Sequence, residues 1–211
     1  QPYRQKPIFT QTLNYMVFNP YWYVPFSIAQ KDKLPLLRKD VKAMAMLGYE
    51  AKLGSAEPFT SVDSFDWQTI KSSAFALRQK PGEKNALGKI KFMLPNLFNV
   101  YLHDTSDKAL FNKTERIFSS GCIRLAEPKA LANWLLQRES NPALSKLDTL
   151  FNNEETVTIS LLKPVPVYLV YFTAFVGQDN HVIFRRDIYN RDRAIISQLR
   201  NSPVTPDKTS P

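Results

Sequence analysis

Three short segments of alternating apolar and polar residues lead one after another to a histidine in the middle of the chain. They are separated by turn residues and cover residues 75–79, 87–95 and 100–102. Alternation with a period of two predicts half-buried strands, and the Pro81-Gly82 pair and Pro95 predict the breaks between them. This order predicts a β scaffold that presents His103 at the end of a strand, where sheets often carry functional residues.

The other segments add strands and a few helices. Residues 40–48 begin with an N-cap candidate and end in Gly, and Glu127-Pro128 opens a second helix with Pro in its first turn. Residues 156–161 alternate like a strand, and residues 165–176 are almost continuously apolar, which predicts a strand buried on both faces. Because strands predominate and helices do not alternate regularly with them, the predicted fold class is β-rich α+β.

The pattern of the sequence changes between Asp32 and Lys80, where predicted short helices and turn residues replace the strand pattern. A chain of 211 residues is long enough for one domain that carries a smaller inserted lobe. We expect residues 1–31 to begin the main domain, residues 32–80 to form the lobe, and residues 81–200 to complete the main domain and hold the site. Residues 201–211 are rich in Pro, Ser and Thr and are expected to be disordered.

The charge balance allows a polyanionic partner without identifying it. There are 28 Lys and Arg residues against 19 Asp and Glu, a formal net charge of +9. The cations are spread along the chain, and no nucleic-acid recognition motif is present, so no nucleic-acid partner is expected. No apolar run could span a bilayer, and the sequence does not open with the basic and then apolar pattern of a signal segment. Since the sequence starts at Gln1, we expect a processed chain or a fragment whose export signal or anchor lies elsewhere.

The chain contains one cysteine, Cys122, so it can form no internal disulfide. This cysteine ends the run Ser119-Ser120-Gly121-Cys122, and His103 precedes it by 19 positions. A thiolate is a strong nucleophile when an imidazole can take its proton, and the backbone N–H groups of a small-residue turn can form an oxyanion hole. Cys122 could also be an inert buried thiol, and a serine of the same turn would be a weaker nucleophile.

Two further residues are candidates for substrate binding. Arg124 follows the cysteine by two positions and points to the same side on an extended segment, where it could hold a carboxylate or form a structural salt bridge with Asp104 or Glu115. Trp22 could form a wall of a ligand cavity or complete a core. Metal binding needs three or four ligands, more than the patterned His and Cys residues provide, so neither a metal nor a cofactor is expected.

The set of His103 followed by Ser119-Ser120-Gly121-Cys122-Ile123-Arg124 resembles the signature of the YkuD-type L,D-transpeptidases. One departure is Ser120, where many members of the family have His. Residues 87–92 and 101–105 also resemble the family. The Ser-Ser-Gly-Cys-x-Arg box, the residues 21–25, the inserted lobe and the residues 171–176 are similar to its YcbB branch.

The resemblance implies a sandwich or barrel-type β core with a capping lobe, and a peptidoglycan transpeptidase of cell-wall biogenesis and cell shape. Cys122 would form a thioester with a tetrapeptide stem, release D-Ala and pass the acyl group to a second stem as a 3→3 cross-link. His103 would be the base, oriented by a backbone carbonyl near Asp104, with oxyanion donors at Ser120, Gly121 and Cys122. The substrate-binding residues would be Arg124, Ser119, Tyr101, Trp22 and Asp104.

The same resemblance implies carbapenem inhibitors and a periplasmic location, with an inner-membrane anchor outside this chain. Other outcomes remain open: transfer of the acyl group to water by a carboxypeptidase, transfer to a protein, or a cell-wall-binding module with an inert Cys122. A thiolate–imidazolium pair would give a rate that rises as Cys122 ionises and falls as His103 loses its proton.

Overall fold

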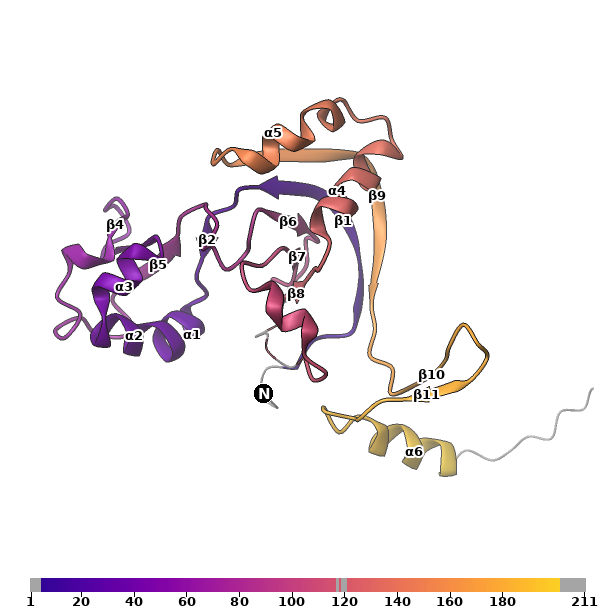
Figure 1. Cartoon of the computed structure of the whole chain (residues 1–211). Helices are drawn as coiled ribbons and strands as arrows, with labels where there is room; N and C mark the ends of the chain where they lie inside the picture. Colours follow the sequence, from indigo (N-terminus) through magenta and orange to yellow (C-terminus); the bar gives the residue numbers. More distant parts are fainter. Residues whose placement is uncertain (1–4, 117, 119–120, 202–211) are drawn as a thin grey trace, which may run out of the picture.

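The computed structural model describes residues 5–116, 118 and 121–201 of the chain. Figure 1 shows a small lobe on the left, a larger body in the centre and a C-terminal arm that projects from the body at the lower right. The β-rich α+β class predicted from the sequence is confirmed by this mixture of sheets and short helices.

The body is built on a five-stranded sheet, in the described residues, with the order β8-β7-β6-β1-β9. The long strands β1 (Phe9–Phe18) and β9 (Val157–Leu169) run antiparallel, and β6 (Ile90–Met93) pairs antiparallel with β1 on its other side. The short strand β7 (Leu102–His103) lies antiparallel to β6 and parallel to β8 (Ile123–Arg124).

The apolar core of the body lies between this sheet and two helices, α4 (Pro128–Gln137) and α5 (Leu147–Asn152), which are joined by the 3₁₀ helix η5 (Pro142–Lys146). Ile90 and Phe92 of β6 are fully buried, whereas Lys91 between them is on the opposite face. The predicted start of α4 at Pro128 is confirmed. One face of the sheet is therefore committed to packing, and the other is free to carry polar side chains.

The lobe has its own sheet, with the order β2-β5-β3-β4, from strands β2 (Trp22–Tyr23), β5 (Ala76–Gln79), β3 (Tyr49–Lys52) and β4 (Thr60–Ser61). Its helices are α1 (Phe26–Ile28), the π-helix η2 (Ala29–Lys33), α2 (Leu34–Lys39), α3 (Val41–Met46) and the 3₁₀ helix η3 (Val62–Ser64). Asp40 caps α3 as predicted, since its carboxylate accepts a hydrogen bond from the Ala43 N–H at 2.9 Å. A separate cluster of buried side chains, among them Leu37 and Trp67, forms the core of the lobe.

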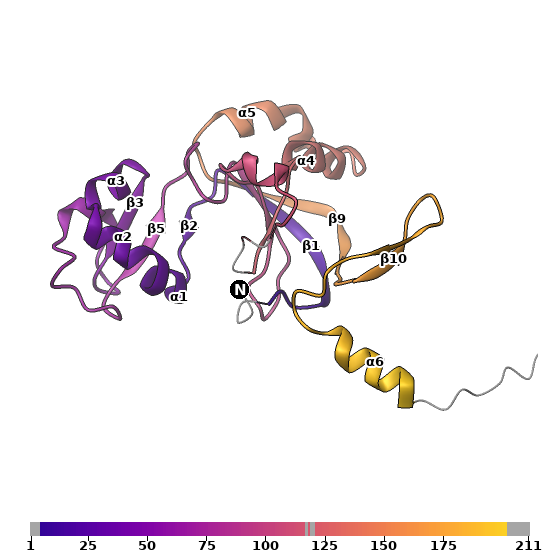
Figure 2. The same ribbon diagram turned by 60° about the horizontal axis from the view of Figure 1, so that its bottom comes forward.

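The lobe includes residues that the sequence pattern assigned to the main domain. The strand β2 and the residues Val24 and Ala29 lie before residue 32. Nevertheless, β2 pairs with β5 of the lobe, and Val24 and Ala29 belong to the buried cluster of the lobe. The lobe boundary predicted at Asp32 left these residues out because a strand of two residues has almost no detectable periodicity. The arrangement of the lobe beside the body is visible from a second direction in Figure 2.

The C-terminal arm follows β9 and contains the hairpin β10 (Ala174–Val176) and β11 (Val182–Phe184) and the helix α6 (Asp192–Asn201). The strands β10 and β11 pair antiparallel. The prediction that residues 165–176 are buried on both faces is wrong, because β9 is an edge strand and the chain then leaves the body; Phe172 and Val176 are each 64% exposed. No helix in the described part of the chain combines the length and apolar character needed to cross a bilayer. Of the predicted tail, residues 201–211, Asn201 ends α6 and residues 202–211 lie outside the described residues.

Candidate active site

The parallel pairing of β7 and β8 brings the histidine and the cysteine together. His103 stands opposite Arg124 in the ladder, the Ile123 N–H donates to the Tyr101 carbonyl at 3.1 Å, and the Leu125 N–H donates to the His103 carbonyl at 2.8 Å. Side chains alternate across a strand. Leu102 and Ile123 pack on the core, so His103 and Arg124 lie on the opposite face, together with Cys122 one step earlier.

These side chains line a cavity of about 570 Å³ between the body and the lobe. The body contributes residues that include Tyr101, His103, Gly121, Cys122 and Arg124, and the lobe contributes Trp22 and Lys33 among others. The volume is in the range of small-molecule sites. Within the described ranges, no three His, Cys, Asp or Glu side chains gather as they would around a metal ion.

His103 is held in one tautomer. Its ring is 6% exposed, and Nδ1 lies within hydrogen-bond distance of the backbone carbonyl oxygen of Asp104. A carbonyl oxygen can only accept, so Nδ1 carries the proton and Nε2 is left as an unprotonated base. The pKa of His103 is lowered to about 4, mainly by burial and in part by the nearby Arg124, against the opposing effect of the Asp104 carbonyl. The imidazole is therefore neutral at neutral pH.

Cys122 is a half-buried thiol rather than a preformed thiolate. Burial raises its pKa, while hydrogen bonding from Tyr101 and the charges of Lys6 and Lys91 act in the opposite direction. The sulfur lies 3.8 Å from the carbonyl oxygen of Asn99, and no hydrogen bond among the described residues joins it to the His103 ring. The pKa shifts of both groups favour a neutral pair at rest, contrary to the thiolate–imidazolium pair expected from the sequence. The physical cause is burial, which disfavours both charged forms.

Two lysines near the thiol were not found by sequence reasoning. Lys91 pairs with His103 across β6 and β7, and its ammonium lies 5.7 Å from the centre of the Tyr101 ring. Burial lowers the pKa of Lys91, and the negative charge of an ionised Cys122 raises it. Lys91 lies between two apolar residues of a strand, and this alternation is the sequence signal that could have placed its side chain on the face of the site. Lys6 comes from the segment before β1, where the sequence has no recognisable pattern.

Arg124 lines the cavity, as its spacing from Cys122 predicts. Neither of its suggested salt-bridge partners binds it: the Asp104 carboxylate pairs with Lys108 at 2.6 Å, and the Glu115 carboxylate pairs with Arg186 at 3.3 Å. Its Nε is buried and has no hydrogen-bond partner in the part of the chain that the structure describes. A buried donor without an acceptor is costly, so Arg124 is ready to bind an anionic group.

The other predicted site residues differ in position. Trp22 and Tyr101 line the cavity, and Gly121 does so with φ of 140°, a backbone conformation that strongly favours glycine. Asp104 does not line the cavity, and its buried carboxylate is held within the protein, which leaves it no place in substrate contact. Ser119 and Ser120, with their predicted oxyanion and substrate contacts, lie outside the described residues.

Comparisons with known proteins agree with the site. A family model described as the YkuD L,D-transpeptidase catalytic domain matches residues 1–167. The chain is also 32% identical over 193 residues to a protein of Haemophilus influenzae named "Putative L,D-transpeptidase", an alignment that covers 91% of this chain and 39% of that protein. The chain thus spans well under half the length of that curated relative. It belongs to the family of YkuD L,D-transpeptidase catalytic domains.

Proposed function

We propose that this catalytic domain is a peptidoglycan L,D-transpeptidase that forms 3→3 cross-links through a thioester on Cys122. The observation that supports the proposal most directly is the parallel register of β7 and β8, which brings His103, Cys122 and Arg124 to one face of the sheet at a shared cavity. A nucleophile, a base of defined tautomer and a cation for an anionic substrate are the groups that acyl transfer requires.

In the first half-reaction, the Cys122 thiol attacks the carbonyl carbon that joins the third residue of a tetrapeptide stem to its terminal D-Ala. His103 Nε2 takes the thiol proton as the C–S bond forms. The C–N bond to D-Ala then breaks, and the imidazolium returns the proton to the leaving amine. The backbone N–H groups of Gly121 and Cys122 would stabilise the oxyanion. The products are a thioester and free D-Ala.

In the second half-reaction, a side-chain amine of another stem attacks the thioester carbonyl. His103 Nε2 takes a proton from the attacking amine, the C–S bond breaks, and the sulfur recovers its proton from the imidazolium. Because the imidazole is neutral before each half-reaction, one residue can serve both. The capping lobe, whose Trp22 and Lys33 face the cavity, would shield the thioester from water between the two steps.

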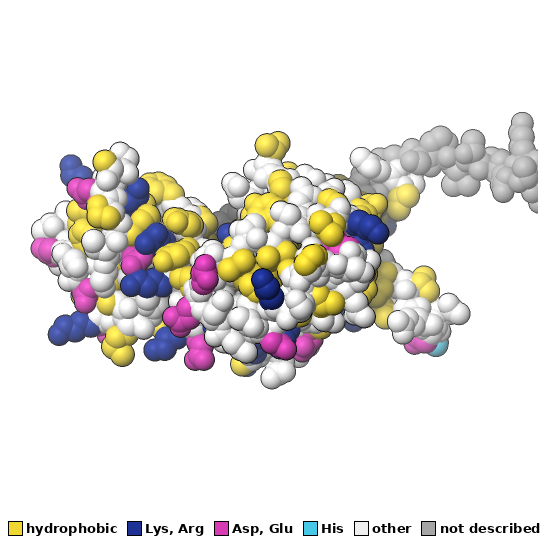
Figure 3. Space-filling view, turned by 90° about the horizontal axis from the view of Figure 1, so that it is seen from above, with side chains coloured by type: hydrophobic (Ala, Val, Ile, Leu, Met, Phe, Trp, Pro, Cys, Tyr) yellow, Lys and Arg dark blue, Asp and Glu magenta, His cyan; other side chains and the backbone are white. Residues whose placement is uncertain are grey.

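The substrate is expected to be an acidic peptide. The cavity wall carries Arg124 from the body and Lys33 from the lobe, and Lys and Arg side chains are spread over the lobe in Figure 3. Carboxylates of a stem peptide would pair with these cations, and the Nε of Arg124, which has no hydrogen-bond partner among the described residues, supports this role for Arg124. Carbapenems, which combine a carboxylate with a strained acyl group, would acylate the same sulfur and inhibit the enzyme.

We assign the chain to the YcbB-like branch on its Ser-Ser-Gly-Cys-x-Arg box and its lobe, and place its work in the periplasm, where peptidoglycan is cross-linked. In the full-length protein, an anchor to the inner membrane would lie in a segment outside this chain.

The proposal is tested with a disaccharide-tetrapeptide substrate and mass spectrometry of the products. Wild-type protein is expected to release D-Ala and yield a cross-linked dimer, and Cys122→Ala is expected to do neither. A dimer formed by Cys122→Ala would overturn the nucleophile assignment. D-Ala release without a dimer would indicate water as acceptor and a carboxypeptidase, whereas tight binding with no acyl-enzyme in wild type would indicate a cell-wall-binding module.

Intact-protein mass after carbapenem treatment tests the nucleophile without any peptide. One drug mass should be added to wild type and none to Cys122→Ala. Since the chain has one cysteine, any addition to the variant would have to lie on another residue.

A further inference from the structure

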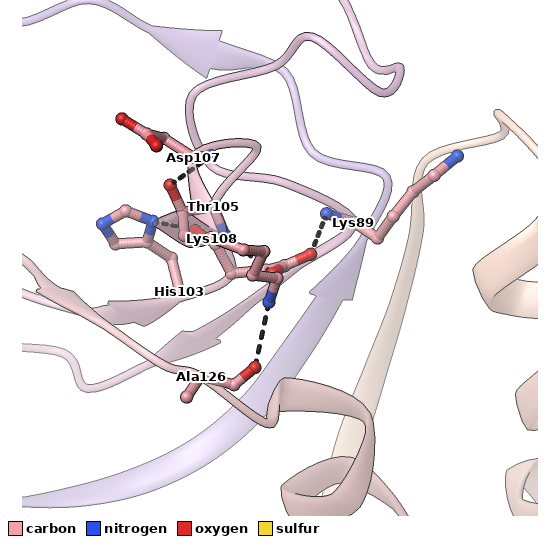
Figure 4. Close-up of polar contacts among 7 residues, drawn as sticks. Lys89, His103, Thr105, Asp107, Lys108 and Ala126 are labelled. Carbon is pink, nitrogen blue, oxygen red and sulfur yellow. Dashed lines mark hydrogen bonds and ion pairs between the residues drawn. The ribbon is translucent and has the colours of Figure 1, made fainter. Parts of the chain in front are cut away.

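Asp104 follows His103 in the chain, does not line the cavity and is almost fully buried. It is 6% exposed and accepts hydrogen bonds from the Lys89 N–H at 2.8 Å and from the Thr105 N–H at 2.7 Å. Lys108 completes the set with an ion pair at 2.6 Å. Figure 4 shows the partner residues Lys89, Thr105 and Lys108 near His103. Such a fully satisfied buried carboxylate holds the backbone around it in one arrangement.

Gly88 makes room for this carboxylate. Its φ is 60°, and a Cβ atom at this position would overlap the Asp104 carboxyl group. An L side chain is disfavoured here both by the backbone conformation and by the contact. The turn that contains Gly88, before β6, therefore packs directly against the side chain of Asp104, which follows β7.

Lys108 extends the contact network to the other side of the site. Its ammonium bridges the Asp104 carboxylate and, at 3.0 Å, the carbonyl oxygen of Ala126, which follows β8. Lys108 begins the 3₁₀ helix η4 (Lys108–Asn112). One side chain thus links the segment that follows the histidine to the segment that follows the cysteine (Figure 4).

The hydrogen bond from Thr105 fixes the direction of one carbonyl group. The Thr105 N–H and the Asp104 carbonyl belong to the same planar trans peptide unit, in which N–H and C=O point in opposite directions. When the carboxylate holds that N–H on one side, the carbonyl must point to the other, where it accepts the proton on Nδ1 of His103. The preceding peptide unit is also held, since the Asp104 N–H donates to the Ile90 carbonyl at 2.9 Å.

We propose that Asp104 is a positioning residue that acts through His103: with Gly88 and Lys108 it holds the Asp104 carbonyl toward Nδ1 and so keeps Nε2 as the base facing the cavity. This role rests on the proposed function of His103 as the base. Without the carboxylate, the peptide unit could rotate, the ring could adopt its other tautomer, and the protonated Nε2 could no longer accept the thiol proton.

The test combines a rate with the ¹⁵N chemical shifts of the imidazole, which distinguish the tautomers. Wild type is expected to show the Nδ1–H tautomer alone, and Asp104→Ala a mixture of both, with carbapenem acylation of Cys122 slower by about 100-fold. Asp104→Asn keeps an oxygen that can accept from Thr105 and is expected to recover part of the rate and of the tautomer preference.

Glu139 provides a matched control. Its carboxylate is 7% exposed and, like that of Asp104, accepts two backbone N–H bonds, from Leu162 and Lys163, but it does not line the cavity. Glu139→Ala should lower thermal stability and leave the tautomer of His103 unchanged. If Asp104→Ala behaves in the same way, with a single tautomer and a wild-type rate, the positioning role is wrong.

A double-mutant comparison separates this inference from the proposed function. In a His103→Ala background, the further change Asp104→Ala should slow acylation by less than about twofold, because its effect passes through the imidazole. An equal loss in both backgrounds would overturn the inference, whereas full activity of His103→Ala alone would overturn the catalytic role of His103 instead. If Asp104→Ala does not fold, Lys108→Met offers a second test. It removes only the half-exposed ammonium from the three partners of the Asp104 carboxylate and should still shift the tautomer balance of His103.

Discussion

The body and the lobe are built alike but carry different chemistry. Each has a sheet with an apolar cluster of its own, and each contains a buried carboxylate that forms at least one ion pair. In the lobe, Glu50 pairs with the side chains of Arg78 at 2.7 Å and Lys80 at 3.1 Å. In the body, Asp104 accepts two backbone N–H groups as well as Lys108. The lobe carboxylate ties side chains together, whereas that of the body orients backbone next to a reactive group.

This difference indicates a division of labour. All the groups proposed to make and break bonds belong to the body, where one face of the sheet is fixed by its core. The lobe contributes to the same cavity an indole, Trp22, and an ammonium, Lys33, which lies 5.4 Å from the Trp22 ring and 5.1 Å from the Tyr49 ring. Changes in the body should therefore alter the chemical rate, and changes in the lobe should alter binding.

The largest effect is expected from removal of the base. His103→Ala should slow acylation of Cys122 by about 10³-fold, within the usual range for a general base. The chain offers a matched control in its other histidine: the His181 side chain is 82% exposed on the hairpin of the arm, and His181→Ala should leave the rate unchanged. Stopped-flow measurement of carbapenem acylation gives both rates. Equal rates for the two variants would show that His103 of the body is not the base.

The next effect concerns pH. Because the pKa of His103 is lowered from 6.5 to about 4, mainly by burial, the base stays neutral at mildly acidic pH and is lost only when the pH falls through about 4. Acylation should be insensitive to pH between about 5 and 7 and fall about tenfold per unit below 4. Circular dichroism at each pH checks that the fold persists. A decline centred near 6.5 would instead indicate a solvated imidazole, and with it the ion pair expected from the sequence.

A smaller effect is expected from the lobe. Lys33→Met should raise KM for the tetrapeptide about tenfold, as the loss of a hydrogen bond to a charged group predicts, with kcat nearly unchanged. Lys52→Met is the matched control, since the Lys52 ammonium also lies on an aromatic ring of the lobe, 5.3 Å from that of Phe59, but does not line the cavity. A fall in kcat for Lys33→Met, with KM unchanged, would assign the lobe a part in the chemistry.

The smallest effect on reactivity is expected from the core of the lobe. Leu37 and Leu135 are each 1% exposed, in the lobe and body clusters respectively. Either change to Ala should reduce the free energy of unfolding by about 2–5 kcal/mol. Only Leu135→Ala, which loosens the core beneath the site, should also slow iodoacetamide alkylation of Cys122. Thermal unfolding and alkylation rates measure the two quantities, and slower alkylation in Leu37→Ala would show that the clusters are coupled.

Local patterns in the sequence predicted local structure well. The cap at Asp40, the Pro start of α4 and the strand end at His103 each depend on a few neighbouring residues. Arg124 lines the cavity, as its spacing from Cys122 on an extended segment indicates, and so does Tyr101, which only the family resemblance had named; their contact with substrate stays a prediction.

Features that depend on distant pairing could not be predicted. Only the register between β6, β7 and β8 shows that Lys91 stands beside His103, and only the fold around Gly88 shows why Asp104 is buried. The neutral state of the thiol and the imidazole follows from burial, which two residues far apart in sequence do not reveal. The edge position of β9 likewise left exposed an apolar run that seemed by composition to belong to a core.

The parallel pairing of β7 and β8 has a consequence for protein engineering. Parallel neighbours cannot be joined by a tight turn, so a long connection between His103 and Cys122 is obligatory, and its length does not set the distance between the two strands. The ladder and the Lys108 bridge hold that distance instead. Residues 113–116, which are exposed, therefore offer a site where a reporter peptide could be grafted into the connection without altering the spacing of the catalytic pair.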